Sequence, residues 1–325
     1  MLFRVRNNTD KLIRQRNASP HTIRAYRDTF RLLLAYARTA TGTEPSQLTL
    51  AQLDTTMITG FLGHLEASRG NTARTRNARL AAIRSLFRYA ALAAPDDAET
   101  IQRVLAISGK RTDTTIISFL DEHESQALLA ACDQQTWIGR RDRAMLLLAL
   151  RAGLRVSELT ALTCSDIQLG TGAHIRCTGK GRKERATPLK PGTAAILRAW
   201  LDERGGDPAS PLFCTRQGRP LSTDAVEDRI AKYHQIASAS CVSLAGKKIS
   251  PHTLRHSAAM ALLRAGVDIA VIALWLGHES IQSTQAYLHA DLKLKERALA
   301  RTTPADVPAG RYQPGDSLLA FLESL

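Results

Sequence analysis

The sequence is short of the features that mark membrane and secreted proteins. No apolar run approaches the roughly 20 residues that a membrane-spanning helix needs, and the first residues, MLFRVRNNTDKLIRQRN, lack the apolar core of a signal peptide. The five cysteines are odd in number and none has C-x-x-C spacing, which argues against a disulfide framework and a zinc site. We therefore expect a cytoplasmic protein with free thiols, no metal or other cofactor and no membrane association.

Negative charge is also scarce. The chain has 44 Lys and Arg against 30 Asp and Glu, a formal net charge of +14. That balance suits a polyanion such as nucleic acid, although a basic protein need not bind one. Residues 1–110 hold 17 basic and 8 acidic side chains, and Arg outnumbers Lys there by 15 to 2. Because a planar guanidinium matches phosphate geometry, this part is the first candidate for contacting a nucleic-acid backbone.

Length and pattern predict two domains. The 325 residues, 44% of them apolar, suffice for two ordinary cores. Helical periodicity predicts a helical domain over residues 1–105, and the aperiodic polar stretch 106–117 predicts a linker. Residues 118–301 are expected to form a mainly α-helical domain with a small antiparallel sheet. Residues 302–325, with three prolines and two glycines, predict a flexible tail whose apolar end, SLLAFLESL, needs a surface to dock on.

The first domain is expected to carry its arginines on helices. Ser19-Pro20 predicts a helix start, and further helices are expected at about 50–68 and 72–92. The arginines of the first helix lie beside an apolar stripe at helical spacing, so they are expected to face phosphate; a solvated basic face is the alternative. Those of the third helix form no single stripe, which leaves their DNA-facing side open. The candidate DNA-contacting residues of this domain are Arg24, Arg27, Arg31, Arg38, Arg74, Arg76 and Arg79.

The second domain is expected to combine helices with one hairpin. Asp121 and Glu124 form a capping-box pattern at its first helix. The runs AHIRCT (173–178) and ERATPL (184–189) predict two strands joined by the turn GKGRK. The expected helices are 121–132, 140–152, 157–162, 191–204, 222–239, 252–265, 268–276 and 280–299.

Five polar motifs in this domain could carry chemistry, although each one alone has an ordinary structural explanation. AGLRVSEL places Arg155 just after a glycine turn, with Glu158 three residues on. GKGRKER places Lys180 and Lys183 in a hairpin turn whose glycines would let a ligand approach the backbone closely. A solvated turn arginine and a plain basic hairpin are the alternative interpretations.

The other three motifs follow along the chain. SPHTLRH places His252, Arg255 and His256 off the apolar stripe of a helix, so they need not be buried against the core. LGH ends in His278, and STQAYLH places Tyr287 nine residues later. Two histidines and an arginine within five residues favour a phosphate site, whereas a lone helical tyrosine is ordinarily a packing residue.

In combination these motifs resemble a known family. The order AGLRVSEL, GKGRKER, PHTLRH and LGHESIQSTQAYLH resembles the tyrosine recombinase and phage integrase family, its Xer-type members in particular, over about residues 10–300. The resemblance implies an N-terminal helical core-binding domain of the SAM-like type. It implies a C-terminal α+β catalytic domain, mainly α-helical with a small antiparallel β-sheet.

The resemblance also implies a role for each motif residue. Arg155 and Arg255 would clamp the scissile phosphate, and His252 and His278 would donate further hydrogen bonds to it. Tyr287 would attack the phosphorus and form a 3′-phosphotyrosine bond. Lys180 would be the general acid for the leaving 5′ oxygen, with Lys183 of the same turn as its rival; Lys183 is otherwise a candidate DNA contact. Glu158 and His256 would support the phosphate ligands from behind.

The implied activity is site-specific recombination. Such an enzyme cuts and rejoins double-stranded DNA without metal or ATP, as a homotetramer in the synapse, with related recombinases as candidate partners, in association with the nucleoid. Integration, excision and resolution of a mobile element or replicon all stay open. A type IB topoisomerase and a non-catalytic DNA-binding regulator are the alternatives. A metal-dependent nuclease is a weaker one, because the histidines lack the carboxylate or cysteine spacing of a metal site.

Two segments depart from the compact Xer pattern. They are the polar insertion at about 239–248 and the tail. Both favour a mobile-element recombinase with its own partners. We expect residues 316–325, behind their flexible connection, to dock on a neighbouring protomer.

Overall fold

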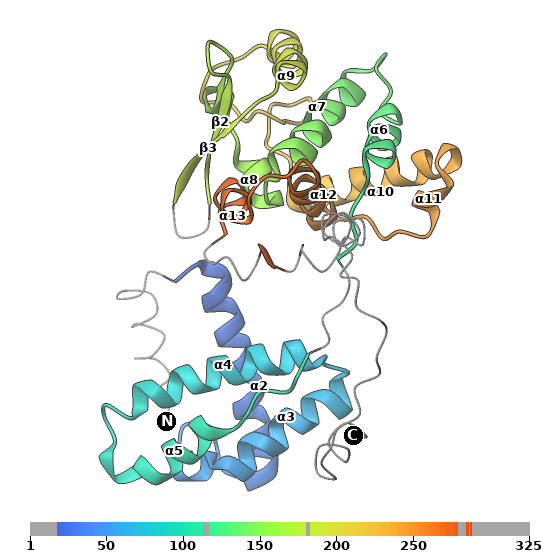
Figure 1. The fold of residues 1–325 in the computed structure, drawn as a ribbon. Helices are drawn as coiled ribbons and strands as arrows, with labels where there is room; N and C mark the ends of the chain where they lie inside the picture. Colours follow the sequence, from blue (N-terminus) through green and yellow to red (C-terminus); the bar gives the residue numbers. More distant parts are fainter. Residues whose placement is uncertain (1–17, 113–116, 180–182, 279–283, 286, 288–325) are drawn as a thin grey trace, which may run out of the picture. The chain divides into compact units, whose positions relative to one another are not determined.

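The computed structural model describes residues 18–112, 117–179, 183–278, 284–285 and 287 (Figure 1). The chain divides into two compact units, Met1–Thr115 and Ile116–Leu325. Both units are mainly helical and the second holds a small antiparallel sheet, which confirms the expected fold class. The expectations for Lys180, for the tail 302–325 and for most of the helix 280–299 fall outside the described residues. None of the helices within the described ranges is long and apolar enough to cross a membrane.

The first unit packs its helices around one apolar core. Its elements are α2 (Pro20–Thr41), η1 (Ala51–Leu53), α3 (Thr55–Arg69), α4 (Ala73–Ala90), η2 (Pro95–Asp97) and α5 (Ala98–Ala106). The predicted start of α2 is confirmed, because the Ser19 hydroxyl accepts a hydrogen bond from the Thr22 amide at 3.2 Å. Helix α5 was not predicted. It has only nine residues, and its buried positions are just Ile101 and Val104, too few to mark a period.

The second unit is built around α7 and α12. Figure 1 shows the sheet and α9 on one side of this pair, and α6, α10 and α11 on the other. Its helical elements are α6 (Glu122–Ala130), α7 (Trp137–Ala152), α8 (Val156–Ala161), η3 (Cys164–Asp166), α9 (Pro191–Arg204), α10 (Thr223–Ser240), α11 (Val242–Ala245), α12 (Pro251–Arg264) and α13 (Ile269–Leu276). Most of α7 is buried, as its apolar run MLLLAL requires.

The sheet has three strands in the order β1-β2-β3, each antiparallel to the next. The strands are β1 (Ile167–Gln168), β2 (His174–Thr178) and β3 (Glu184–Pro188). The predicted hairpin is confirmed: Thr178 faces Glu184, and the Gly179 amide donates to the Lys183 carbonyl at 2.8 Å. The two residues of β1 were not predicted, since so short a strand has no recognisable alternation.

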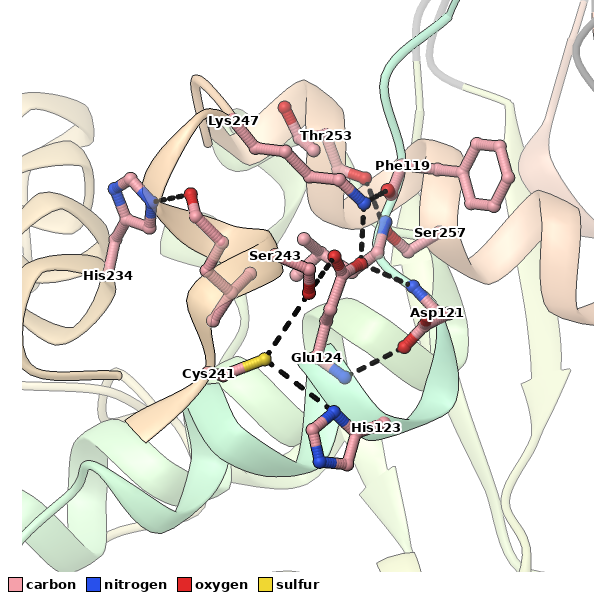
Figure 2. Close-up of polar contacts among 12 residues, drawn as sticks. Phe119, Asp121, His123, Glu124, His234, Cys241, Ser243, Lys247, Thr253 and Ser257 are labelled. Carbon is pink, nitrogen blue, oxygen red and sulfur yellow. Dashed lines mark hydrogen bonds and ion pairs between the residues drawn. The ribbon is translucent and has the colours of Figure 1, made fainter. Parts of the chain in front are cut away.

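The polar insertion at 239–248 is fixed to the start of the second unit (Figure 2). The Lys247 ammonium donates to Glu124 Oε2 at 2.6 Å and to the Phe119 carbonyl at 3.0 Å. The Ser243 hydroxyl donates to Glu124 Oε1 at 2.7 Å. Glu124 also accepts the Asp121 amide at 2.9 Å, which confirms the predicted capping box of α6. The buried Glu124 carboxylate, with Lys247 and Ser243, thus holds the insertion against the segment where the unit begins. We call these three residues the clasp.

Candidate active site

The site starts at the turn between α7 and α8. Gly153 ends α7 with φ +64°, and a Cβ there would lie 2.6 Å from Leu276 Cδ2, so a glycine lets α13 pack closely. Arg155 follows as the N-cap of α8, and its amide donates to Glu158 Oε2 at 2.8 Å. The turn therefore sets the arginine and the carboxylate of AGLRVSEL side by side.

Glu158 is the centre of the cluster. Its side chain is 3% exposed and accepts from Arg155 Nη1 at 2.8 Å and from Arg185 Nη1 and Nη2 at 3.0 and 2.7 Å. Arg255 Nη1 lies 3.9 Å from Glu158 Oε2. Burial raises the pKa of Glu158, but the hydrogen bonds from Arg185 and Arg155 outweigh burial, so the pKa lies below its ordinary value. The carboxylate therefore stays charged among three guanidiniums.

Arg255 is buried, although it lies off the apolar stripe of its helix. Its Nη1 donates to the Gly153 carbonyl and its Nη2 to the Leu276 carbonyl, each at 2.7 Å. Burial, and then the nearby Arg155, lower the pKa of Arg255 to about 10, so it stays protonated at neutral pH. The helical period missed this burial because the two carbonyls come from the ends of other helices.

Those carbonyls explain how the site tolerates buried cations. Helices α7 and α13 both end at left-handed glycines, Gly153 and Gly277, and the last carbonyls of a helix carry partial negative charge. Arg255 binds the carbonyls of Gly153 and Leu276, and Arg155 Nη2 binds that of Gly277 at 3.1 Å. Two helix C-termini thus aim their unpaired carbonyls at the arginine pair and hold it from behind.

Tyr287 lies beside this pair among histidines. Its hydroxyl is 3.0 Å from His256 Nδ1, and its ring stacks on that of His278 at a centroid distance of 6.3 Å and 11°. His278 Nδ1 is 2.7 Å from the Thr284 hydroxyl. The exposed His252 is next to His256, with ring centroids 6.5 Å apart. The structure thus gathers the histidines and the tyrosine of the last three motifs.

Burial sets the protonation of these groups. It lowers the pKa of His256 to about 4, with His252 and Arg255 adding to the effect. It lowers the pKa of His278 to about 4, with Arg255 and Arg155 adding to the effect. Burial raises the pKa of Tyr287, which Arg255 and Arg155 lower only in part. In this state at neutral pH the imidazoles of His256 and His278 are neutral, and the Tyr287 phenol keeps its proton.

The hairpin contributes a residue that sequence reasoning missed. Lys180 lies outside the described residues, and Lys183 is exposed at the end of the turn. Arg185, two residues further on, is the one that reaches Glu158. A signal was available, because a strand alternates its faces and Arg185 shares its side with Thr187, which is buried.

The expected DNA-contacting arginines of the first unit divide by burial. Exposed side chains belong to Arg24, Arg27, Arg31, Arg38 and Arg74, while Arg79 is half-buried. Arg76 is buried, lies 3.5 Å from Glu66 and donates to the Asn77 side chain at 3.3 Å. Its burial does not fit a DNA-contacting role, and we correct that expectation. Arg76 stands four residues before Leu80, on the core face of α4.

Comparison with known proteins identifies the family of this chain. Residues 118–293 match the phage integrase family, and residues 8–93 match the N-terminal SAM-like domain of phage integrases. The chain belongs to the phage integrase family. The resemblance drawn from the motifs is confirmed, and this integrase-family protein is a tyrosine-type site-specific recombinase.

Several members of the family are similar along most of the chain. The Sinorhizobium fredii protein y4rC, an integrase/recombinase by name, is 52% identical over 315 residues, 97% of this chain and 95% of y4rC. The tyrosine recombinase XerC of Pelobacter propionicus is 35% identical over 280 residues, 86% of this chain and 87% of XerC. The XerH site-specific recombinase, solved with a palindromic difH substrate after cleavage, has a TM-score of 0.66 and 23% identity, over 88% of this chain and 81% of XerH.

Proposed function

We propose that this integrase-family protein breaks and rejoins DNA at a specific site through a 3′-phosphotyrosine bond to Tyr287. The observation that carries the proposal is the position of the Tyr287 hydroxyl, 3.0 Å from His256 and close enough to Arg255 and Arg155 for their charges to act on it. A tyrosine that served only packing would need no cationic surroundings.

The arginine pair suits the charge of the reaction. A phosphodiester is already negative, and its transition state places more charge on the non-bridging oxygens. Arg155 and Arg255 would bind these oxygens, with His252 and His278 as further donors; preorganised donors of this kind usually supply the largest catalytic term. Because Glu158 and helix carbonyls already hold both guanidiniums, little reorganisation would be needed when DNA arrives.

Each step can be written with its protons. The Tyr287 oxygen forms a bond to phosphorus while the bond to the 5′ oxygen breaks. The leaving oxygen takes a proton from Lys180, with Lys183 as the alternative donor. Tyr287 passes its own proton to neutral His256, which already accepts its hydrogen bond. The 5′ hydroxyl of the partner strand then gives its proton to the deprotonated lysine and attacks the phosphotyrosine. The bond between phosphorus and Tyr287 breaks, and Tyr287 takes its proton back from His256. Because the covalent bond conserves the phosphodiester's energy, the reaction runs without ATP, and the cationic side chains take the part of a metal.

A nicked suicide substrate tests the proposal directly. Once its recombination site has been mapped in cells, the full chain with that nicked duplex in EDTA should form a covalent adduct. Tyr287→Phe should abolish the adduct. Tyr233→Phe is the matched control, because this buried tyrosine of the same unit binds Asp142 at 2.9 Å, away from the site. An adduct that persists in Tyr287→Phe, or one that requires magnesium, would contradict the mechanism.

The same assay separates the alternative functions. A type IB topoisomerase would relax a supercoiled plasmid that lacks the mapped site. A non-catalytic regulator would bind the site with an affinity that falls with salt, yet form no adduct. Exchange between two sites, detected as recombinant product, distinguishes the recombinase from both.

Assembly is the second part of the proposal. We take the active form on paired sites to be a tetramer, with residues 1–105 as the core-binding domain, 106–117 as the linker and 118–301 as the catalytic domain. Residues 316–325 would dock on a neighbouring protomer. Deleting residues 304–325 should then reduce cooperative assembly and recombination while leaving single-site binding intact. Unchanged assembly would rule out this docking role.

The natural substrate is proposed to lie on a mobile element or replicon. The support is the 52% identity to a protein named integrase/recombinase, together with the insertion that Glu124 holds in place. Mapping the binding sites in cells, in the cytoplasm beside the nucleoid, checks this. Sites at the ends of an element or on a plasmid replicon agree with it, and a lone site at the terminus of chromosome replication contradicts it.

A further inference from the structure

Arg185 touches the supports of several proposed catalytic groups at once. It stands on β3, its side chain is 11% exposed, and both of its terminal nitrogens donate to Glu158, at 3.0 and 2.7 Å. Glu158 in turn receives the guanidinium and the amide of Arg155. Arg185 therefore satisfies the carboxylate that holds Arg155.

Two glycines pack against the same side chain. A Cβ on Gly277 would lie 2.9–3.3 Å from Arg185 Nη1, Cδ and Cζ, and a Cβ on Gly179 would lie 3.1 Å from Arg185 Nη1. Gly277 directly precedes His278, and Gly179 directly precedes Lys180. The flat guanidinium thus fits against backbone at two places where a side chain would collide with it.

We infer that Arg185 is a positioning residue that keeps Arg155 and His278 in register for phosphoryl transfer. The inference rests on the proposed function. Arg185 acts through Glu158, Gly179 and Gly277, because both terminal nitrogens are already occupied by the carboxylate. Lysine could keep the charge, but it offers neither the paired donors nor the flat surface.

Loss of Arg185 has a definite electrostatic consequence. Glu158 would keep its charge with fewer donors, so it would draw Arg155 and Arg255 away from the position of the phosphate. The glycines on either side would also lose the surface that fixes them. A shift of about 1 Å in reacting groups can cost about 100-fold in rate.

The test measures single-turnover cleavage by the full chain on three nicked substrates that differ only at the scissile phosphate. The first has the native phosphate. The second has a neutral methylphosphonate, which relaxes the need for the arginines because one negative charge is gone. The third has a 5′-bridging sulfur, which relaxes the need for the general acid because a thiolate leaves without a proton. Tyr287-dependent cleavage by the unaltered chain on the native substrate establishes the proposed function first.

Arg185→Gln should cut the rate on the native substrate by about 100-fold while DNA binding stays unchanged. The loss should shrink on the methylphosphonate and persist on the 5′-bridging sulfur substrate, and Arg185→Lys should recover only part of the rate. Arg176→Gln is the matched control: Arg176 stands on the neighbouring strand with an exposed side chain and donates to the Ser165 carbonyl. An equal loss on all three substrates, or a loss matched by the unfolded fraction, would overturn the inference. If the unaltered chain forms no adduct, the proposed function fails instead.

Discussion

Two buried carboxylates of the second unit share a local setting but gather different partners. Glu158 and Glu124 each occupy the third position of a helix, and each accepts the amide of its own N-cap residue, at 2.8 and 2.9 Å. Glu124 then meets one cation, the Lys247 ammonium, and the Ser243 hydroxyl. The cations that surround Glu158 are Arg155, Arg185 and Arg255.

The difference decides what charge is left over. The Glu124 carboxylate and the Lys247 ammonium together have no net charge, and their ion pair holds the insertion at 239–248 in place. Among the residues that the structure describes, one carboxylate with three guanidiniums leaves a formal charge of +2 in a largely buried site, which suits a phosphodiester. The helix start specifies where each carboxylate lies. The segments that arrive from elsewhere in the chain specify whether it forms a clasp or an anion site.

Removing one cation from each carboxylate should give the largest difference between the two sites in cleavage rate and stability. Arg255→Gln takes away a proposed phosphate ligand and leaves the Gly153 and Leu276 carbonyls without their donor. We expect cleavage to fall by about 1,000-fold and the free energy of unfolding by about 2 kcal/mol. Lys247→Gln should lower stability and leave the cleavage rate per folded molecule unchanged. Adduct formation and urea unfolding measure the two effects, and an equal catalytic loss in both variants would contradict the distinction.

Neutralising the carboxylates themselves should give a smaller effect of the same kind. Glu158→Gln keeps the shape but cannot accept from every guanidinium around it, so Arg155 loses its fixed position. We expect about a 100-fold slower cleavage at unchanged DNA affinity. Glu124→Gln should instead cost about 1 kcal/mol of stability, because the Lys247 side chain is 32% exposed and water partly replaces its partner. A cleavage defect in Glu124→Gln at full folding would mean that the clasp also reaches the active site.

How far the sequence predicts these two sites depends on how far apart the partners lie along it. The capping box of α6 is local, and its motif identified it. Glu158 lies three residues after Arg155 and was expected as a support behind the phosphate ligands, but its hydrogen bond with Arg155 was not predicted. The bounds of α9 also agree with the predicted 191–204, because a proline and a glycine mark its ends. The burial of Arg255 could not be predicted, since its acceptors are 102 and 21 residues away and only the fold brings them together. For Arg185 the strand alternation pointed inward, but the carboxylate that it meets is 27 residues away.

Acid should lower the free energy of unfolding through the buried groups of the active site. Burial lowers the pKa of His256 and His278 to about 4 from an ordinary 6.5, so between these pH values the unfolded chain binds more protons. The free energy of unfolding should therefore fall as the pH drops from 6.5 towards 4. Glu158 adds to the fall at lower pH, because its pKa is depressed below 4.5 and its stabilisation is lost as the pH falls through the folded-state value.

Urea midpoints at pH 7 and pH 5 measure this dependence of stability on pH. His256→Asn should flatten the slope of stability against pH, and His21→Asn, on the exposed start of α2, is measured in parallel. An unchanged slope would show that His256 is not held neutral.

The smallest expected effect extends the comparison to the first unit. Glu66 there accepts the Lys110 ammonium at 2.9 Å and lies 3.5 Å from the buried Arg76, so it connects Lys110 with α3 and α4 as Glu124 connects Lys247 with α6. Arg76→Gln should therefore cost about 1 kcal/mol of stability and leave the salt dependence of DNA binding unchanged. Arg74→Gln, on the exposed face of the same helix, should leave stability unchanged and reduce the slope of log affinity against log salt by about 1, as expected for one lost phosphate contact. Binding titrations at several salt concentrations separate the two variants. A reduced slope in Arg76→Gln would mean that this arginine leaves Glu66 for phosphate when DNA binds.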